Sequence, residues 1–458
     1  MNKVILSTML SICCLLPVKA QDEGYIYDTD PLIVQKLEDW QDMKFGLMIC
    51  WGPYSIWGVI EGWSICSEDW EWNKRPSNKS YAEYLKEYEM LPRYFNPLSF
   101  NPDKWAKAAK AAGMKYVVLI TKHHDGFCMF DTKYTDYKIT DPSVPFHKNP
   151  KANVTKEVFN SFRNEGMAIG AYFSKPDWAH PDFWAPEWAT PNRSVNYDTQ
   201  KYPERWQRFK DFTYNQIEEL VTNYGKVDIL WLDGAWVHKK NPNMDPDIGR
   251  IGRMVRSHQP DMLIVDRSGG GLYENYCTPE QEIPDKPLSY PWETCMTMTK
   301  SWSWTPDDIY KPTRQIIHML VDIVAKGGNY LLNLGPGPHG DFDDLAYQRL
   351  SEIGQWLKIN GEAIYSTRSI APYKQGKVCY TSKKDGTIYG IYLSDENEAM
   401  PVEVLLEGIT APKQTKITML GINGNCKWKQ TDKGVLVSIP ASAQKVQPSP
   451  YAWTIKIR

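Results

Sequence analysis

The sequence predicts an α/β fold, a (β/α)8-type TIM barrel followed by a C-terminal antiparallel β-sandwich. Short apolar strands alternate with helical patterns from about residue 45 to 360, and repeated strand–helix units need crossovers and hence a parallel sheet. Nearly every strand ends in polar or aromatic residues, which favours a barrel, where all strand ends meet at one mouth, over an open doubly wound sheet. After about residue 366 only short β-prone segments remain, separated by turn residues, as in a small sandwich.

The barrel strands are expected where apolar residues run continuously, because such strands are covered on both faces. These runs span residues 45–50, 115–120, 168–174, 228–233, 262–267 and 330–335. Helices are expected between them from caps and stops, beginning with the one that Asn101 caps and Gly113 ends. The others cover about 155–165, 203–224, 248–258, 312–326 and 345–360. Sandwich strands are expected at 377–380, 387–393, 402–406, 415–420, 434–439 and 452–457.

Residues 1–20 resemble a secretory signal, with Lys3, an apolar run from Val4 to Val18, and Ala20 before a polar segment. We therefore expect an exported, soluble protein, periplasmic or secreted, with no membrane span. A lipid anchor at Cys13 is the alternative, although the bulky Ile12 before it fits that cleavage poorly. The expected domains are the signal peptide (1–20), a catalytic barrel (21–365) and the sandwich (366–458).

Composition excludes some partners and cofactors. The 53 Lys and Arg nearly balance the 55 Asp and Glu, which argues against nucleic acid, because such partners need a concentrated positive field. Two of the 9 cysteines lie in the signal segment, and the other seven, at irregular spacing, form no disulfide framework or CxxC zinc motif. Neighbouring His123 and His124 point in different directions and suit one metal ion poorly. We expect no metal and no cofactor.

The most informative segment is DILWLDGAW (228–236), in which an apolar strand ends on Asp233. Burying an unpaired carboxylate costs several kcal/mol, whereas a barrel mouth is where enzymes place catalytic groups. Tryptophans on both sides suit the apolar face of a sugar, so we interpret Asp233 as a glycosidase nucleophile. The alternative is a strand-end Asp that caps the next helix.

Other polar residues could complete such a site. Glu293 follows Trp292, and aromatic surroundings disfavour its charged form, which suits a proton donor. One ionised and one protonated carboxyl group are what glycoside hydrolysis requires. Arg267 ends a strand and could keep Asp233 ionised or bond a ring oxygen. His123 and His124 could bond ring hydroxyls, although one of them could instead be bonded to backbone.

Six segments, in order, resemble the α-L-fucosidases of glycoside hydrolase family 29 over roughly residues 30–365. They are KFGLMICWGPYS (44–55), KHHDGF (122–127), GAYFSKPDW (170–178), WLDGAW (231–236), WETCMTM (292–298) and LVDIVAKGGNYLLNLGPGPHG (320–340). The resemblance implies a distorted barrel and a metal-free retaining double displacement with Asp233 as nucleophile and Glu293 as general acid/base. It also implies sugar contacts from His123, His124, Tyr172, Trp231 and Arg267. The family further places a carboxylate–tryptophan pair after the first strand; this pair aligns here in two ways, and it implies sugar contacts from Glu68 and Trp70.

The chain departs from the family at the end of the first strand. The usual Phe-Ile-His-Trp-Gly reads Met-Ile-Cys-Trp-Gly here, so Cys50, beside Trp51, stands where an imidazole would bond a sugar hydroxyl. A thiol is smaller and a weaker hydrogen-bond partner. We expect a retaining exo-α-L-fucosidase acting on fucosylated glycans. A related α-L-glycosidase, such as an α-L-galactosidase, is the alternative, and an inactive glycan-binding protein is a third possibility.

Overall fold

The computed structural model describes residues 25–68, 75–76, 78–190 and 192–458. The predicted signal segment 1–20 and Trp70 lie outside the described residues. None of the described helices is long and apolar enough to cross a membrane.

The N-terminal part is built on a parallel sheet of seven strands in the order β5-β4-β3-β2-β1-β7-β6. The strands are β1 (Phe45–Ile49), β2 (Tyr116–Lys122), β3 (Ala168–Ser174), β4 (Ile229–Asp233), β5 (Leu263–Asp266), β6 (Glu293–Thr297) and β7 (Asn329–Leu334). In the described chain β6 pairs only with β7 and β5 only with β4, and the stretch between β5 and β6 makes isolated bridges rather than an eighth strand. The predicted distorted barrel is therefore confirmed as a parallel half-barrel.

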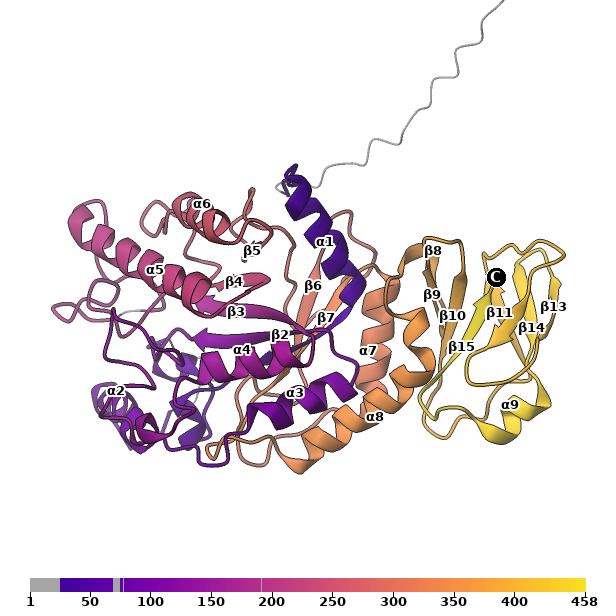
Figure 1. Ribbon diagram of the computed structural model, residues 1–458, viewed down its shortest axis with the longest axis horizontal. Helices are drawn as coiled ribbons and strands as arrows, with labels where there is room; N and C mark the ends of the chain where they lie inside the picture. The colour runs from indigo at the N-terminus through magenta and orange to yellow at the C-terminus, as the bar shows by residue number, and fades with distance from the viewer. Residues whose placement is uncertain (1–24, 69–74, 77, 191) are drawn as a thin grey trace, which may run out of the picture.

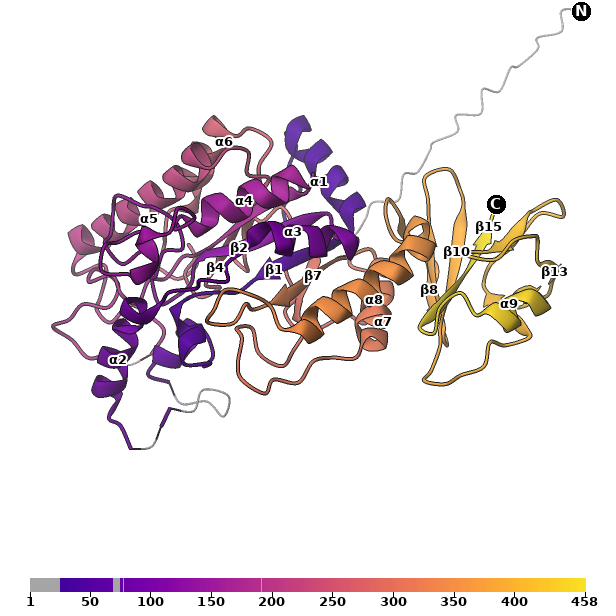
Figure 2. The ribbon, with the colours of Figure 1, turned by 60° about the horizontal axis from the view of Figure 1, so that its bottom comes forward.

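Helices flank this sheet, as Figures 1 and 2 show. The six helices expected from the sequence are α3 (Pro102–Ala111), α4 (Val154–Asn164), α5 (Pro203–Asn223), α6 (Ile248–His258), α7 (Thr313–Ala325) and α8 (Asp344–Asn360). The Asn101 side chain caps α3 as predicted, accepting a hydrogen bond from the backbone N–H of Lys104 at 3.3 Å. The sequence patterns missed α1 (Pro31–Met43), α2 (Tyr81–Glu89) and the 3-10 turns η1 (Pro53–Ile56), η2 (Gly62–Ile65), η3 (Leu91–Tyr94), η4 (Pro145–Lys148) and η5 (Gly361–Ala363).

Alternate side chains of the barrel strands pack into two separate apolar clusters, one on each face of the sheet. Leu47 and Ile49 of β1 belong to the core that the outer helices cover, while Met48 and Cys50 belong to a second, inner cluster. Because successive side chains of a strand point to opposite faces, every second residue of these strands points inward. Trp231 of β4 is among these inward residues.

The C-terminal part is an antiparallel sandwich, as predicted. One sheet has the order β12-β15-β10-β9-β8 and the other β11-β14-β13. Its elements are β8 (Arg368–Gln375), β9 (Val378–Ser382), β10 (Ile388–Leu393), β11 (Glu403–Glu407), β12 (Ile417–Met419), β13 (Lys427–Gln430), β14 (Gly434–Ser438), α9 (Ala441–Val446) and β15 (Ala452–Ile457). α7 and α8 lie between it and the barrel sheet (Figure 1), and the indole of Trp356 donates a hydrogen bond to the carbonyl of Ala452 at 3.1 Å.

Candidate active site

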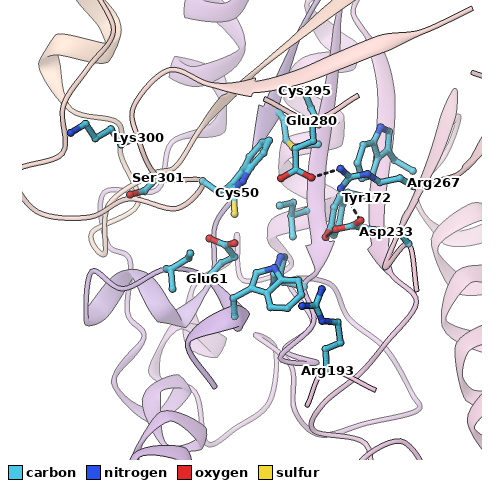
Figure 3. A pocket seen from close by; sticks show the side chains of 18 of the residues that line it. Cys50, Glu61, Tyr172, Arg193, Asp233, Arg267, Glu280, Cys295, Lys300 and Ser301 are labelled. Carbon is cyan, nitrogen blue, oxygen red and sulfur yellow. Dashed lines mark hydrogen bonds and ion pairs between the residues drawn. The ribbon is translucent and has the colours of Figure 1, made fainter. Parts of the chain in front are cut away.

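A cavity of about 820 Å³ opens where the carboxyl ends of the barrel strands meet. Inward-facing residues of β1 to β4 and of β6 form its floor, and loops that follow the strands form its walls (Figure 3). Its lining is Met48, Cys50, Ile60, Glu61, Trp63, Ile120, His123, Tyr172, Arg193, Trp231, Asp233, Ala235, Trp236, Arg267, Glu280, Cys295, Lys300, Ser301, Trp302 and Thr305. This is the place where barrel enzymes carry their active sites.

Asp233, the last residue of β4, projects into this cavity (Figure 3). Its carboxylate accepts hydrogen bonds from the hydroxyl of Tyr172 at 2.6 Å and from the guanidinium of Arg267 at 3.0 Å. Burial would raise the pKa of Asp233, but the charge of Arg267, helped by His124 and the Tyr172 hydroxyl, holds it well below its usual range. Asp233 is therefore ionised at any physiological pH, the state that a nucleophile needs.

His123 and His124 follow β2 and are both buried beside Asp233. The Nε2 of His124 lies 3.7 Å from a carboxylate oxygen of Asp233. Burial lowers the pKa of both imidazoles, that of His124 to about 4, so both rings are neutral near pH 7. Nδ1 of His123 and both ring nitrogens of His124 are buried and make no hydrogen bond within the described residues. His123 is part of the cavity lining and its neutral imidazole can bond a hydroxyl of a ligand. His124 is not part of that lining, because its ring packs against Trp63, Trp178 and Trp236.

Aromatic rings form the walls around Asp233. Tyr172 stacks on Trp231 with ring centroids 5.3 Å apart, and the guanidinium of Arg267 lies 5.4 Å from the centroid of Trp231. Across the cavity Trp63 packs against Trp236 at 5.4 Å. Such faces suit the C–H surface of a pyranose ring, and together with neutral imidazoles they define a sugar-binding cavity.

Glu293 does not reach this cavity. It is the first residue of β6, at the end of the sheet opposite to the mouth, and it is 0% exposed. Its carboxyl group accepts hydrogen bonds from the hydroxyl of Tyr116 at 2.5 Å and from the indole N–H of Trp231 at 3.2 Å. Burial raises the pKa of Glu293 to about 7, as the sequence suggested, but the structure does not bring its carboxyl group together with Asp233.

Two other glutamates line the cavity, and the sequence analysis singled out neither. Glu280, from the loop before β6, pairs with the same guanidinium of Arg267 that binds Asp233 (Figure 3). Glu61, from the loop after β1, lies beside Cys50 on the opposite wall (Figure 3). Both stand in irregular loops that carry no periodicity or motif, so only the fold could reveal them.

Of the remaining predicted residues, Cys50 lines the cavity, whereas Trp51 and Glu68 do not. Cys50 lines the cavity and its sulfur lies 3.5 Å from the hydroxyl of Tyr54. Trp51 points into the helix-covered core, and its indole donates to the carbonyl of Gly337 at 3.2 Å. Glu68 is not part of the lining, because its carboxylate pairs with Arg193, whose Nε lies 3.0 Å away. Among the described residues, no group of three or more His, Cys, Asp or Glu is arranged to hold a metal ion.

An ionised carboxylate at the mouth of a parallel half-barrel, between aromatic walls and neutral imidazoles, defines a glycoside hydrolase. The chain belongs to the α-L-fucosidase family, since the model described as "Alpha-L-fucosidase" matches residues 13–362 and that of the "Alpha-L-fucosidase C-terminal domain" matches 372–458. The tissue alpha-L-fucosidase of Homo sapiens is 31% identical over 468 residues, covering 94% of this chain and 91% of the relative. That of Mus musculus is 30% identical over 460 residues, covering 94% of each.

Solved structures agree with this membership. Alpha-L-fucosidase isoenzyme 1 from Paenibacillus thiaminolyticus matches with a TM-score of 0.76 and 29% identity, over 93% of this chain and 99% of the other. A family 29 α-L-fucosidase from Bacteroides thetaiotaomicron, trapped as a covalent intermediate with 2-fluoro-fucosyl fluoride, matches with a TM-score of 0.73 and 26% identity, over 97% and 100%. These relatives support a retaining fucosidase and do not favour the α-L-galactosidase alternative.

Proposed function

We propose that this protein is an exported, retaining exo-α-L-fucosidase that removes terminal α-L-fucosyl residues from glycans. Asp233 attacks the anomeric carbon and forms a fucosyl–enzyme ester, and water later hydrolyses that ester with net retention. The observation that carries the proposal is the ionised Asp233 carboxylate, fixed by Tyr172 and Arg267 inside a cavity with aromatic walls. Export is supported by the signal-like segment 1–20. Mass spectrometry of the mature N-terminus, in cell fractions, distinguishes cleavage after Ala20 from a lipid anchor on Cys13.

The general acid/base is the second part of this proposal. The sequence motif points to Glu293, whereas the geometry favours Glu280, because Glu280 lines the cavity and Glu293 does not. Two carboxylates that share one guanidinium are held close together, which suits the separation of about 5–5.5 Å that retaining enzymes use. The Glu280 side chain is 38% exposed, so a leaving group and then a water molecule can reach it. In this mechanism the carboxyl group of Glu280 gives a proton to the glycosidic oxygen, and the resulting carboxylate later activates water.

Azide rescue distinguishes the roles of Asp233, Glu280 and Glu293, because the anomeric configuration of the fucosyl azide product shows in which step azide acts as the nucleophile. With Asp233→Gly, azide attacks the fucoside directly and gives the β-fucosyl azide. With Glu280→Ala, azide attacks the fucosyl–enzyme ester and gives the α-fucosyl azide. Glu293→Ala, checked for folding by circular dichroism, is the matched control and is expected to form no azide adduct. An α-azide from Glu293→Ala but not from Glu280→Ala would return the acid/base role to Glu293.

A further inference from the structure

A buried ion pair lies behind the nucleophile, outside the sugar cavity. Nζ of Lys175, the residue after β3, is 2.5 Å from a carboxylate oxygen of Asp266, the last residue of β5, and the two side chains are 0% and 6% exposed. A buried pair of this kind adds little net stability, because the cost of removing two charges from water offsets most of their attraction. Its place in the sheet points to a different role.

The pair spans the end of the strand that carries Asp233. β4 lies between β3 and β5 (Figure 1), so Lys175 and Asp266 join two strands that are about 10 Å apart, twice the spacing of neighbouring strands. Backbone hydrogen bonds flank the same place. The N–H of Lys175 donates to the carbonyl of Asp233 at 2.9 Å, and the N–H of Arg267 donates to the carbonyl of Leu232 at 3.2 Å. The end of β4 is therefore held from both sides.

Side-chain alternation places the pair on the opposite face of the sheet from the nucleophile. Tyr172 of β3 and Val265 of β5 belong to the inner cluster. Lys175 and Asp266 follow them by an odd number of residues, so their side chains face outward. Arg267, one residue after Asp266, faces inward and lines the cavity. A displacement of Asp266 must therefore displace the guanidinium that binds the nucleophile.

The chain that carries Lys175 also packs directly on the end of β4. Gly234 follows Asp233 with a φ of +93°, a conformation that favours glycine. A Cβ at this position would come within 2.4 Å of Cδ of Pro176. Only glycine allows the two segments to approach this closely, so a movement of Lys175 and Pro176 is transmitted to Asp233.

The turn after β5 is equally close-packed around the other member of the pair. A Cβ at Gly269 would lie 2.0 Å from Oδ2 of Asp266. The carboxylate of Glu274 accepts hydrogen bonds from the backbone N–H of Ser268 at 3.0 Å and of Gly270 at 2.7 Å. The turn thus wraps around the Asp266 carboxylate, and Lys175 holds that carboxylate in place.

We propose that the Lys175–Asp266 ion pair is a positioning device for the reaction, which fixes β4 against β5 so that the guanidinium of Arg267 meets the carboxylate of Asp233 at 3.0 Å. Neither Lys175 nor Asp266 is part of the cavity lining, so both act through Asp233 and Arg267 and are positioning residues. The inference rests on the proposed fucosidase function of the same site.

Asp266→Asn distinguishes positioning from a direct effect of charge, because the two predict shifts of opposite sign. Loss of a negative charge near Asp233 would by itself favour the ionised carboxylate and move the acid limb of the pH–activity profile downward. A displaced Arg267 moves the limb upward, because burial then favours the neutral carboxyl form. The other titratable groups near the pair, from the loops after β4 and β5, stay unchanged in this variant and are His238, Lys239 and Glu274.

The assay is kcat/KM with 4-nitrophenyl α-L-fucoside from about pH 2 to 7, in which the acid limb reports on the free enzyme. In Asp266→Asn the limb is expected about 1 pH unit above that of the wild type, with a plateau about 10- to 100-fold lower because the reacting groups are misplaced. Lys175→Met is expected to shift the limb in the same direction. Lys36→Met is the matched control, since it removes the ion pair of Asp228 at the amino end of the same strand. That control is expected to lower the unfolding temperature and to leave the pH profile unchanged.

Three results would overturn the inference. One is an acid limb in Asp266→Asn at or below that of the wild type. Another is an equal upward shift in Lys36→Met, since any loss of stability around β4 would then be sufficient. The third is a failure of both Asp266→Asn and Lys175→Met to fold, judged by circular dichroism, while Lys36→Met folds, because the pair would then serve folding alone. A wild type that hydrolyses no fucoside is a separate result, which refutes the proposed function.

Discussion

Replacing Arg267 by Met should move the acid limb of the pH–activity profile upward, because Arg267 is what keeps Asp233 ionised. In the wild type the two side chains are joined at 3.0 Å and are only 15% and 13% exposed. The variant leaves burial as the main influence on Asp233, and burial favours the neutral carboxyl form. A hydrogen bond to a charged group contributes about 1.5–3 kcal/mol, which corresponds to about 1–2 pH units at 1.36 kcal/mol per unit.

The assay is kcat/KM with 4-nitrophenyl α-L-fucoside from about pH 2 to 7. The limb set by Asp233 should lie about 1–2 pH units higher in Arg267→Met than in the wild type, while Arg267→Lys should show an intermediate shift because one donor with the same charge remains. Arg193→Met is the matched control, since Arg193 lines the same cavity but its ion pair runs to Glu68. An acid limb at the same pH in the wild type and in Arg267→Met would refute the argument that Arg267 sets the charge of Asp233.

Three further substitutions test other parts of the structure. Glu293→Gln should stabilise the protein by about 1–3 kcal/mol at pH 8 but little at pH 4. Burial raises the pKa of Glu293 to about 7, so the contribution of the neutral Glu293 to the stability of the wild type is lost as pH rises through that value. Thermal unfolding of both proteins at the two pH values would contradict this if the difference were absent. Gly46→Ala should destabilise the fold by at least about 2 kcal/mol, because its Cβ would lie 2.4 Å from the ring of Tyr116; an unchanged denaturation midpoint would show that the ring can move. Cys50→His should lower stability by about 1–3 kcal/mol, because the larger ring must fit beside Tyr54 where Cys50 is 1% exposed; a variant that unfolds at the wild-type temperature would show room for the imidazole.

The sequence was sufficient for the half-barrel and for the position of Asp233 at the end of a strand, because both depend on local patterns. The run from Ile229 to Asp233 is apolar up to its last residue, so both the strand and the exposed end of that strand can be predicted. Helix α6 lies at the predicted residues because its cap, Asp247, and its apolar face are local features. Strand β6 was missed because Glu293, Thr294 and Thr297 are polar in sequence although all five of its residues are buried.

That missed strand determines where the motif places Glu293. Once β6 is known to run from Glu293 to Thr297, parallel to β7 with Glu293 opposite Asn329, Glu293 must lie at the amino end of the strand. Catalytic groups of barrel enzymes lie at the carboxyl ends, where Asp233 stands. Glu293 instead holds Trp231 and Tyr116 in place from beneath. Its place in the WETC motif therefore agrees with a supporting role, and the loop residue Glu280 becomes visible only when Arg267 is seen to bind two carboxylates at once.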